Sequence, residues 1–215
     1  MISLSRGGTS AQLTQADRVR LTREWQQRHH LVLPRFFHDT LLGEIRREIG
    51  TPVFTPEGYE VGHEQLFPEG SLVRLLDFLM NDPPLLDAVR ELTGCETIGR
   101  FHGRIYRLTP GTDEGHTWHS DWVEGRRIAV TVNLSAAAYE GGRLQMRRSA
   151  THELLADVAN HGEGDALLFR LAPGLEHQVQ RVAGAVPRIA YAGWFSDGPS
   201  LRDQLSSMAV TAGPK

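Results

Sequence analysis

The second half of the chain carries a run of short segments with alternating hydrophobicity, and this run most constrains the possible folds. Alternation with a period of two residues is typical of β-strands that have one buried and one exposed face. Gly- and Pro-rich turns such as Glu140-Gly141-Gly142 separate the segments. The strands expected from this pattern are residues 100–108, 117–122, 127–134, 143–147, 165–170, 175–179 and 188–195. The sequence therefore predicts a sheet assembled from many short strands.

The preceding part of the chain has helical periodicity instead. Thr14 is a typical N-cap residue, and the proline pair 83–84 is typical of a helix start. We expect four helices, which begin near Thr14, at Asp39 or Thr40, at Ser71 and at Pro83. Helices followed by strands indicate an α+β fold with a mainly β core. The expected architecture is a two-sheet jelly-roll or barrel with the N-terminal helices packed on one face.

Length and composition indicate one domain, because 215 residues with 40% hydrophobic content are enough to bury one full core. We expect a flexible tail over residues 1–13, which are rich in Ser and Gly, a single domain over 14–196, and a C-terminal tail over 197–215. Within the domain, residues 14–99 would form the helical support and residues 100–196 the β core.

Charge and cysteine content exclude several kinds of partner. The net charge of −3 comes from acids and bases mixed along the chain, which does not favour a nucleic-acid surface. No segment approaches the roughly 18 apolar residues of a membrane-spanning helix. A single cysteine, Cys95, and an N-terminus without a signal-peptide pattern indicate a soluble cytoplasmic protein. The oligomeric state is left open.

The triplet His119-Ser120-Asp121 is the first candidate for chemistry. In a strand, residues i and i+2 point to the same side of the sheet, so His119 and Asp121 would face the barrel interior together. Two histidines and one carboxylate on one face of an iron(II) ion leave the opposite face open. His152 and His161 flank a segment of helical or loop character. His177 instead lies in the expected strand 175–179, after a Pro-Gly turn. His177 is therefore the preferred third ligand.

Other residues near the triplet are open to two interpretations. His116 is five positions from Asp121, so it should face away from the metal, toward the helical layer or solvent, unless the strand carries a bulge. Trp118 and Trp122 should face the other side and pack under the barrel rather than contact a substrate. Residues 51–70 are rich in Pro and Gly and predict a long loop, which is long enough to form a lid.

Arg188 is the second candidate, because it shares a strand face with the small residues Ala190 and Ala192. A guanidinium in such a place needs a carboxylate partner, which could come from a bound ligand or from a structural salt bridge. Without a ligand, Thr131 could supply a hydroxyl to it. Arg181, which lies in the preceding loop, is the fallback.

In this order, the residues resemble the iron(II)- and 2-oxoglutarate-dependent oxygenases, particularly the prolyl-4-hydroxylase-like branch. The resemblance spans about half the chain. It is carried by Tyr106, His119-Ser120-Asp121, Glu140-Gly141-Gly142-Arg143-Leu144, Gly164-Asp165-Ala166-Leu167-Leu168-Phe169, His177-Gln178-Val179, Arg188 and Trp194-Phe195. The chain departs from the branch in three places: Tyr106 lies farther before His119, the spacing from His177 to Arg188 is one residue longer, and Ala190 replaces a hydroxyl residue.

The resemblance implies a double-stranded β-helix that binds Fe(II) through His119, Asp121 and His177. It implies 2-oxoglutarate as co-substrate, with its far carboxylate on Arg188 and with Tyr106 helping to hold it. The implied reaction converts 2-oxoglutarate and O2 to succinate and CO2 and hydroxylates a peptidyl or small-molecule substrate; ascorbate is a further cofactor that the family admits. Halogenating relatives have a small residue at the position of Asp121, so hydroxylation is expected here.

Two other classes of function remain open at this point. A cupin-like metal enzyme could use His119, Asp121 and His177 without 2-oxoglutarate, which would leave Arg188 without a task. A non-catalytic barrel could bind a small molecule or a protein and keep the three residues without using them.

Overall fold

The computed structural model describes residues 1–50, 54–123, 125–160 and 162–200. Within these residues the chain forms four helices: α1 (Gln15–Arg28), α2 (Asp39–Ile49), α3 (Ser71–Met80) and α4 (Pro83–Thr93). The first eight strands are β1 (Ile2–Ser5), β2 (Gly8–Ala11), β3 (His30–Leu33), β4 (Thr55–Tyr59), β5 (Gly62–Leu66), β6 (Ile98–Leu108), β7 (Gly115–His119) and β8 (Arg126–Asn133). The others are β9 (Glu140–Gly141), β10 (Leu144–Arg148), β11 (Leu154–Val158), β12 (Ala166–Arg170), β13 (Leu175–Val179), β14 (Val182–Ala183) and β15 (Arg188–Asp197).

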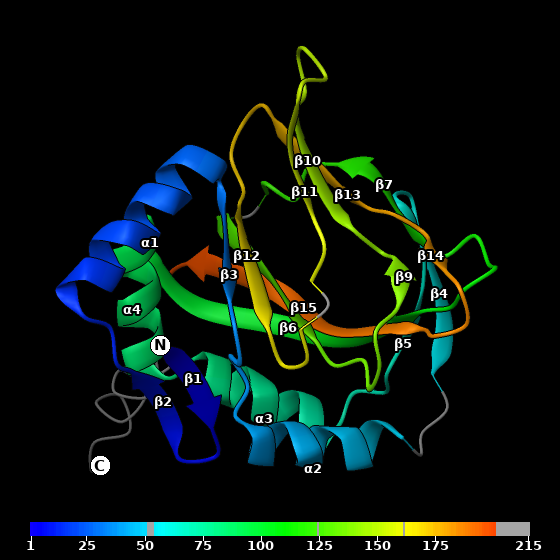
Figure 1. The fold of residues 1–215 in the computed structure, drawn as a ribbon, viewed down its shortest axis with the longest axis horizontal. Coiled ribbons are helices and arrows are strands. Elements are labelled where there is room, and N and C mark those ends of the chain that lie inside the picture. Colours follow the sequence, from blue (N-terminus) through cyan, green and yellow to red (C-terminus); the bar gives the residue numbers. More distant parts are fainter. Residues whose placement is uncertain (51–53, 124, 161, 201–215) are drawn as a thin grey trace, which may run out of the picture.

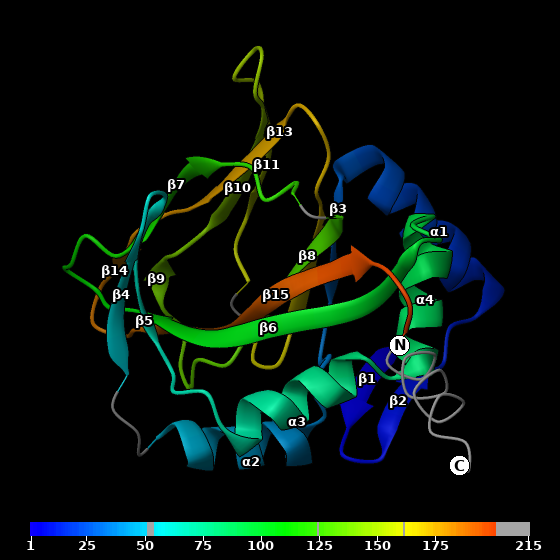
Figure 2. The ribbon, with the colours of Figure 1, turned by 180° about the vertical axis from the view of Figure 1, so that it is seen from behind.

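One large antiparallel sheet forms the centre of the molecule. Its strands follow the order β11-β10-β13-β7-β5-β6-β15-β8-β12-β3, and β4 adds to β5. The sheet curls so that β10 and β13 lie across the interior from β6 and β15 (Figures 1 and 2). Many of its neighbouring strands are far apart in the sequence, as in β6 and β15. The predicted jelly-roll or barrel core is confirmed.

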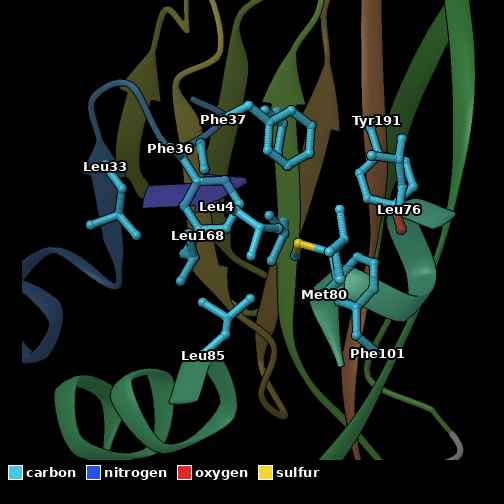
Figure 3. Packing of buried hydrophobic residues seen from close by; sticks show 14 of the residues in the cluster. Leu4, Leu33, Phe36, Phe37, Leu76, Met80, Leu85, Phe101, Leu168 and Tyr191 are labelled. Carbon is cyan, nitrogen blue, oxygen red and sulfur yellow. The ribbon is translucent and has the colours of Figure 1, made fainter. Parts of the chain in front are cut away.

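The helices cover the outside of this sheet on one side, as predicted (Figure 1). Side chains on β15 alternate between the two faces of the sheet, and this alternation explains why the helices pack on one face and the cavity lies on the other. Tyr191 faces outward and packs against Phe37 and Phe101, with ring centroids 6.3 and 5.7 Å away. Figure 3 shows these rings within the apolar cluster between helices and sheet. Arg188 and Trp194, which alternate with Tyr191, line the interior instead. The same strand thus supplies both the core and the inner cavity.

The helix boundaries follow local signals. Thr14 caps α1 in a capping box with Asp17, as expected. Gly94 ends α4 in the left-handed conformation that favours glycine. The expected cap of α2 at Asp39 or Thr40 is wrong by one or two residues, because the ring of His38 accepts the hydrogen bond from the backbone N–H of Thr40.

The expectation of a flexible tail over residues 1–13 is wrong. β1 and β2 form a hairpin there, and Ile2 and Leu4 are 2% and 0% exposed. The backbone N–H of Leu4 donates to the carbonyl of Phe36 at 2.7 Å, and Figure 3 shows Leu4 beside Phe36 in the core. The reason is visible in the alternation of Ile2 and Leu4 with serines, which outweighs the Ser and Gly content.

Three further expectations need correction. The expectation of a long loop over residues 51–70 is wrong, because β4 and β5 form a hairpin that joins the large sheet. Residues 51–53 lie outside the described part. The segment between His152 and His161 forms β11 instead of a helix or loop. The expected start of the C-terminal tail at residue 197 is wrong, because Asp197 belongs to β15; residues 201–215 lie outside the described part. In the described residues, no helix has the length and apolar character needed to cross a membrane.

Candidate metal centre

His119 and His177 lie directly opposite each other on two paired strands. His119 ends β7 and His177 occupies the middle of β13, and the two are partners in the antiparallel register. Partners in such a register point to the same face of the sheet, here the interior. Their ring centroids are 4.2 Å apart. The two histidines, 58 positions apart in the sequence, are therefore brought together by strand pairing.

Asp121 completes the group from a loop. The expectation that it belongs to the same strand as His119 is wrong, because β7 ends at His119. The loop nevertheless brings the carboxylate back to the two rings: Oδ1 is 3.7 Å from Nε2 of His119, and Oδ2 is 3.5 Å from Nε2 of His177. The indole Nε1–H of Trp194 on β15 donates to Oδ2 at 2.8 Å. Trp194 thus fixes the orientation of the carboxylate.

The geometry and charge of this group fit a metal ion. One ligand atom from each residue lies within 4.8 Å of the others, and the two pairs above are closer than the roughly 4.2 Å that two bonds of about 2.1 Å can span. Nδ1 of His119 lies 2.6 Å from the carbonyl of Thr117. A proton on Nδ1 would satisfy this contact and leave Nε2 with its lone pair toward the metal.

The pKa shifts of His119 and Asp121 favour the protonation states that metal binding requires. Burial lowers the pKa of His119, and the neighbouring His177 lowers it further. Burial alone would raise the pKa of Asp121, but the contacts with His177, His119 and Trp194 hold it well below its usual range. At neutral pH His119 is therefore neutral and Asp121 is ionised. Both are the ligating forms.

Arg188 lies deeper in the same interior and is 3% exposed. It donates from one terminal nitrogen to the hydroxyl of Tyr106 and from the other, at 2.9 Å, to Oγ1 of Thr131. Within the described residues no carboxylate pairs with it, and its Nε has no hydrogen-bond partner. Burial alone would lower the pKa of Arg188, but the phenol groups of Tyr106 and Tyr139 raise it, so the side chain is charged.

This arrangement brings together Arg188 and Tyr106, which the resemblance assigns to the co-substrate, and Thr131, which was expected to offer Arg188 a hydroxyl. A buried guanidinium with neutral partners and an unsatisfied N–H is costly, and an anionic ligand would relieve that cost. The fit to a carboxylate is therefore good on the chemistry of Arg188 itself. Gly142 contributes space: its φ is +56°, and a Cβ there would lie 2.8 Å from Cδ of Arg188. The absence of a side chain at Gly142 in the Glu140-Gly141-Gly142 turn thus leaves space for the side chain of Arg188.

A cavity of about 310 Å³ joins the metal group to Arg188. No role was predicted from the sequence for several residues of its wall, above all Arg104, Arg126 and Trp194. Tyr59 and Val61 of the β4–β5 hairpin also line it, so the segment expected as a lid contributes to the wall as a hairpin. Trp194 and Arg104 belong to alternating strands, and their inward positions could have been found from the same alternation that placed Arg188.

The expected orientation of His116 is wrong. His116 lines the cavity, because a register shift between His177 and Val179 places three residue steps of β7 opposite two of β13. This bulge turns both His116 and His119 inward. His116 has a different partner, however: its Nε2 lies 3.0 Å from Oε2 of the buried Glu64.

Three other expected residues lie outside the metal group. Arg181 is exposed and does not line the cavity, so the structure offers it no path to the buried subsite. Trp118 is half-buried, its ring centroid lies 4.2 Å from Cζ of Arg147, and it does not line the cavity, in line with the expectation that it makes no substrate contact. Trp122 is 42% exposed, so the expectation that it packs under the barrel is wrong.

We expect Trp194→Phe to weaken Fe(II) binding by roughly 10- to 100-fold, the usual cost of losing a partner that orients a metal ligand. The phenyl ring keeps most of the packing but cannot donate to Asp121. Anaerobic titration with Fe(II) measures the affinity. Trp118→Phe is the matched control, because the ring of Trp118 packs against Arg147, and the indole that donates to Asp121 is that of Trp194. Equal affinities in the two variants would contradict a role of Trp194 in orienting Asp121.

We expect His116→Ala to retain Fe(II) binding, whereas His119→Ala loses it. The ring of His116 faces into the cavity but is engaged by Glu64. The same anaerobic titration compares the two variants. If His116→Ala lost iron as completely as His119→Ala, His116 would be a ligand and the metal would lie closer to Glu64 than to Asp121.

Comparison with known proteins adds independent evidence. Residues 102–196 match the model of the 2OG-Fe(II) oxygenase superfamily. Among curated proteins, none matches the chain significantly. Among solved structures, a prolyl-4-hydroxylase from Pseudomonas putida is similar with a TM-score of 0.62 and 16% identity, covering 84% of this chain and 99% of that one.

Two further structures have the same fold. A prolyl hydroxylase from Trichoplax adhaerens, in complex with a peptide fragment of the hypoxia inducible factor oxygen degradation domain, has a TM-score of 0.62 and 13% identity and covers 94% and 99% of the two chains. The α-ketoglutarate-dependent epimerase SnoN from nogalamycin biosynthesis has a TM-score of 0.60 and 13% identity and covers 86% and 84%. The predicted double-stranded β-helix is confirmed.

The matched segment runs from β6 to β15 and contains Tyr106, His119, Asp121, His177 and Arg188. It therefore includes the metal group and the buried arginine that lie around one cavity. The donor set suits the Fe(II) that the superfamily uses, and the cavity leaves room for a co-substrate. Residues 102–196 form a domain of the 2OG-Fe(II) oxygenase superfamily, whose members use Fe(II), 2-oxoglutarate and O2, and this domain contains the three residues that could hold the iron.

Proposed function

We propose that this oxygenase is a hydroxylase of a small-molecule or peptidyl substrate, in which His119, Asp121 and His177 hold Fe(II) and Arg188 holds the far carboxylate of 2-oxoglutarate. The observation that carries the proposal is the buried Arg188, which is charged and lacks a carboxylate partner within the described residues. It lies in the cavity that also contains the metal group. A metal barrel that did not use 2-oxoglutarate would leave this charge uncompensated.

Each residue of the site has a defined role in this proposal. Bound Fe(II) with 2-oxoglutarate supplies the oxidation of a substrate C–H bond by O2, with succinate and CO2 as co-products. Arg188 binds a carboxylate through its paired N–H groups, while Tyr106 and Thr131 keep the guanidinium in place. Trp194 orients Asp121. Leu144, Phe169 and Val179 give the cavity an apolar wall that excludes water.

The cavity limits the part of the substrate that enters. Its volume of about 310 Å³ is near the lower end for ligand sites, which measure roughly 300–1,000 Å³. Bound 2-oxoglutarate would occupy part of this volume, so the group that enters beside it should be small. This supports a small molecule or a single residue of a peptide. Asp121 occupies a coordination position as a carboxylate, which supports hydroxylation over halogenation. A cytoplasmic location and the use of ascorbate stay predictions.

Anaerobic titration with Fe(II), with and without 2-oxoglutarate, tests the proposal. We expect a metal-to-ligand charge-transfer band only when both are present, and its loss at moderate 2-oxoglutarate concentration in Arg188→Ala. Aerobic reactions analysed by mass spectrometry should show succinate and a substrate that has gained one oxygen. A wild-type protein that binds Fe(II) but gives no band with 2-oxoglutarate would refute the proposal, and a chlorinated product would refute hydroxylation.

A further inference from the structure

The outer wall of the cavity carries a second set of cationic side chains, distinct from Arg188. Arg104 on β6, Trp194 on β15 and Arg126 at the start of β8 come from three neighbouring strands. Cζ of Arg126 lies 3.8 Å from the ring centroid of Trp194, and Cζ of Arg104 lies 5.4 Å from it. Trp194 also donates a hydrogen bond to Asp121, so the guanidinium groups of Arg104 and Arg126 lie next to the metal group.

Arg104 is held in place by a buried carboxylate. Its Nε donates to Oε1 of Glu64 at 2.7 Å, and the other oxygen of Glu64 contacts His116. Glu64 is 1% exposed. Burial alone would raise its pKa, but His116 and Arg104 lower it below the usual value, so Glu64 is ionised. A buried ion pair of this kind restricts the guanidinium to one position on the wall.

Arg126 is less compensated. Its ion pair within the described residues is a long one, 3.9 Å to Oδ1 of Asp121, and Asp121 is also shared with two histidines. Its neighbour Arg127 bonds to Asp197 and does not line the cavity. The side chain of Arg126 remains partly exposed in the cavity wall, where a ligand can reach it.

The charges around the cavity indicate which kind of partner Arg126 lacks. In the proposed complex, the charges of Fe(II) and Arg188 are balanced by Asp121 and the two carboxylates of 2-oxoglutarate. Glu64 balances Arg104. Among the described residues that line or contact the cavity, one positive charge remains, on Arg126. A guanidinium stacked on an aromatic ring beside a reaction site is well suited to bind a carboxylate.

We infer that the primary substrate carries a carboxylate, which Arg126 binds over Trp194 with Arg104 as a second contact. The apolar group next to this carboxylate lies toward the metal, against Leu144 and Phe169. Tyr59 of the β4–β5 hairpin also lines the cavity, and its ring centroid lies 5.6 Å from Cζ of Arg104. This inference rests on the proposed function, because the charge count includes Fe(II) and 2-oxoglutarate.

The test uses N-acetyl derivatives of apolar amino acids as carboxylate probes and their carboxamides as neutral partners. Calorimetry under nitrogen measures binding to the Fe(II) enzyme at saturating 2-oxoglutarate, which keeps Arg188 occupied, and to the metal-free protein. We expect at least one acid to bind about 10- to 100-fold more tightly than its amide, the usual range for a hydrogen bond to a charged group. Arg126→Gln should abolish this preference, and Arg126→Lys should retain part of it.

Arg127→Gln is the matched control for Arg126→Gln, because Arg127 bonds to Asp197 and does not line the cavity. Equal binding of acids and amides to the wild type, or binding of neither, would overturn the inference. So would an equal loss in Arg126→Gln and Arg127→Gln. Failure of the proposed function would appear separately, as the absence of the 2-oxoglutarate-dependent band in the wild type.

Discussion

Asp121→Ala is expected to abolish hydroxylation and to reduce Fe(II) affinity by more than the roughly 10- to 100-fold that the loss of a ligand's supporting partner costs. The reason is that Asp121 is the one anionic member of the metal group, and its low pKa keeps it ionised at neutral pH. Succinate formation and anaerobic Fe(II) titration measure the two effects. The free energy of unfolding of the metal-free protein should change by only about 1 kcal/mol, because Asp121 lies in a loop at the cavity and not in the core.

Asp157→Ala provides the control for this variant. Asp157 on the edge strand β11 pairs with Arg143, and neither residue lines the cavity, so the substitution deletes a carboxylate and an ion pair outside the cavity. It should keep activity and iron affinity. Full activity of Asp121→Ala would refute the assignment of the ligand. A large loss of stability in Asp121→Ala would show instead that the carboxylate has a structural task, and an Asp121→Asn variant that regained stability but not iron binding would separate the two.

The residues that the sequence placed correctly are those governed by strand alternation. Arg188, Ala190 and Ala192 share the interior face, and Thr131 lies across from Ala192 on β8, within reach of the guanidinium. His177 faces inward for the same reason. Because side chains in a strand alternate with a fixed period, one inward residue determines its neighbours as long as the strand is regular. The inward position of Arg188 could therefore be predicted from the alternation, whereas Tyr106 was expected at this subsite only because of the family resemblance.

The residues placed wrongly lie where this regularity ends. A bulge between His116 and His119 cannot be read from the sequence, since it depends on pairing with β13. Asp121 was expected in a strand that ends two residues earlier, and it faces His119 through loop geometry instead. The contact of Glu64 with Arg104 depends on pairing between β5 and the strands beside it, in a segment whose Pro and Gly content predicts a loop.

Arg188→Ala is expected to raise the apparent Michaelis constant for 2-oxoglutarate by about 30-fold to several thousand-fold. The estimate follows from the roughly 2–5 kcal/mol lost when one partner of a buried charged pair is removed. Arg188 is 3% exposed and bonds to Tyr106 and Thr131, so no other side chain within the described residues can take its place. Fe(II) affinity in the absence of 2-oxoglutarate should stay close to that of the wild type.

Two further variants separate charge from geometry at this position. Arg188→Lys keeps the positive charge but loses the planar pair of N–H groups, so its Michaelis constant should lie between those of the wild type and Arg188→Ala. Arg181→Ala should change neither Fe(II) nor 2-oxoglutarate binding, because Arg181 is exposed and outside the cavity. If Arg181→Ala alone weakened 2-oxoglutarate binding, the co-substrate would bind outside the cavity that contains Arg188. If neither variant did so, Arg188 would be a structural arginine whose unsatisfied Nε is met by water, and an iron enzyme with another mode of co-substrate binding would explain the site better.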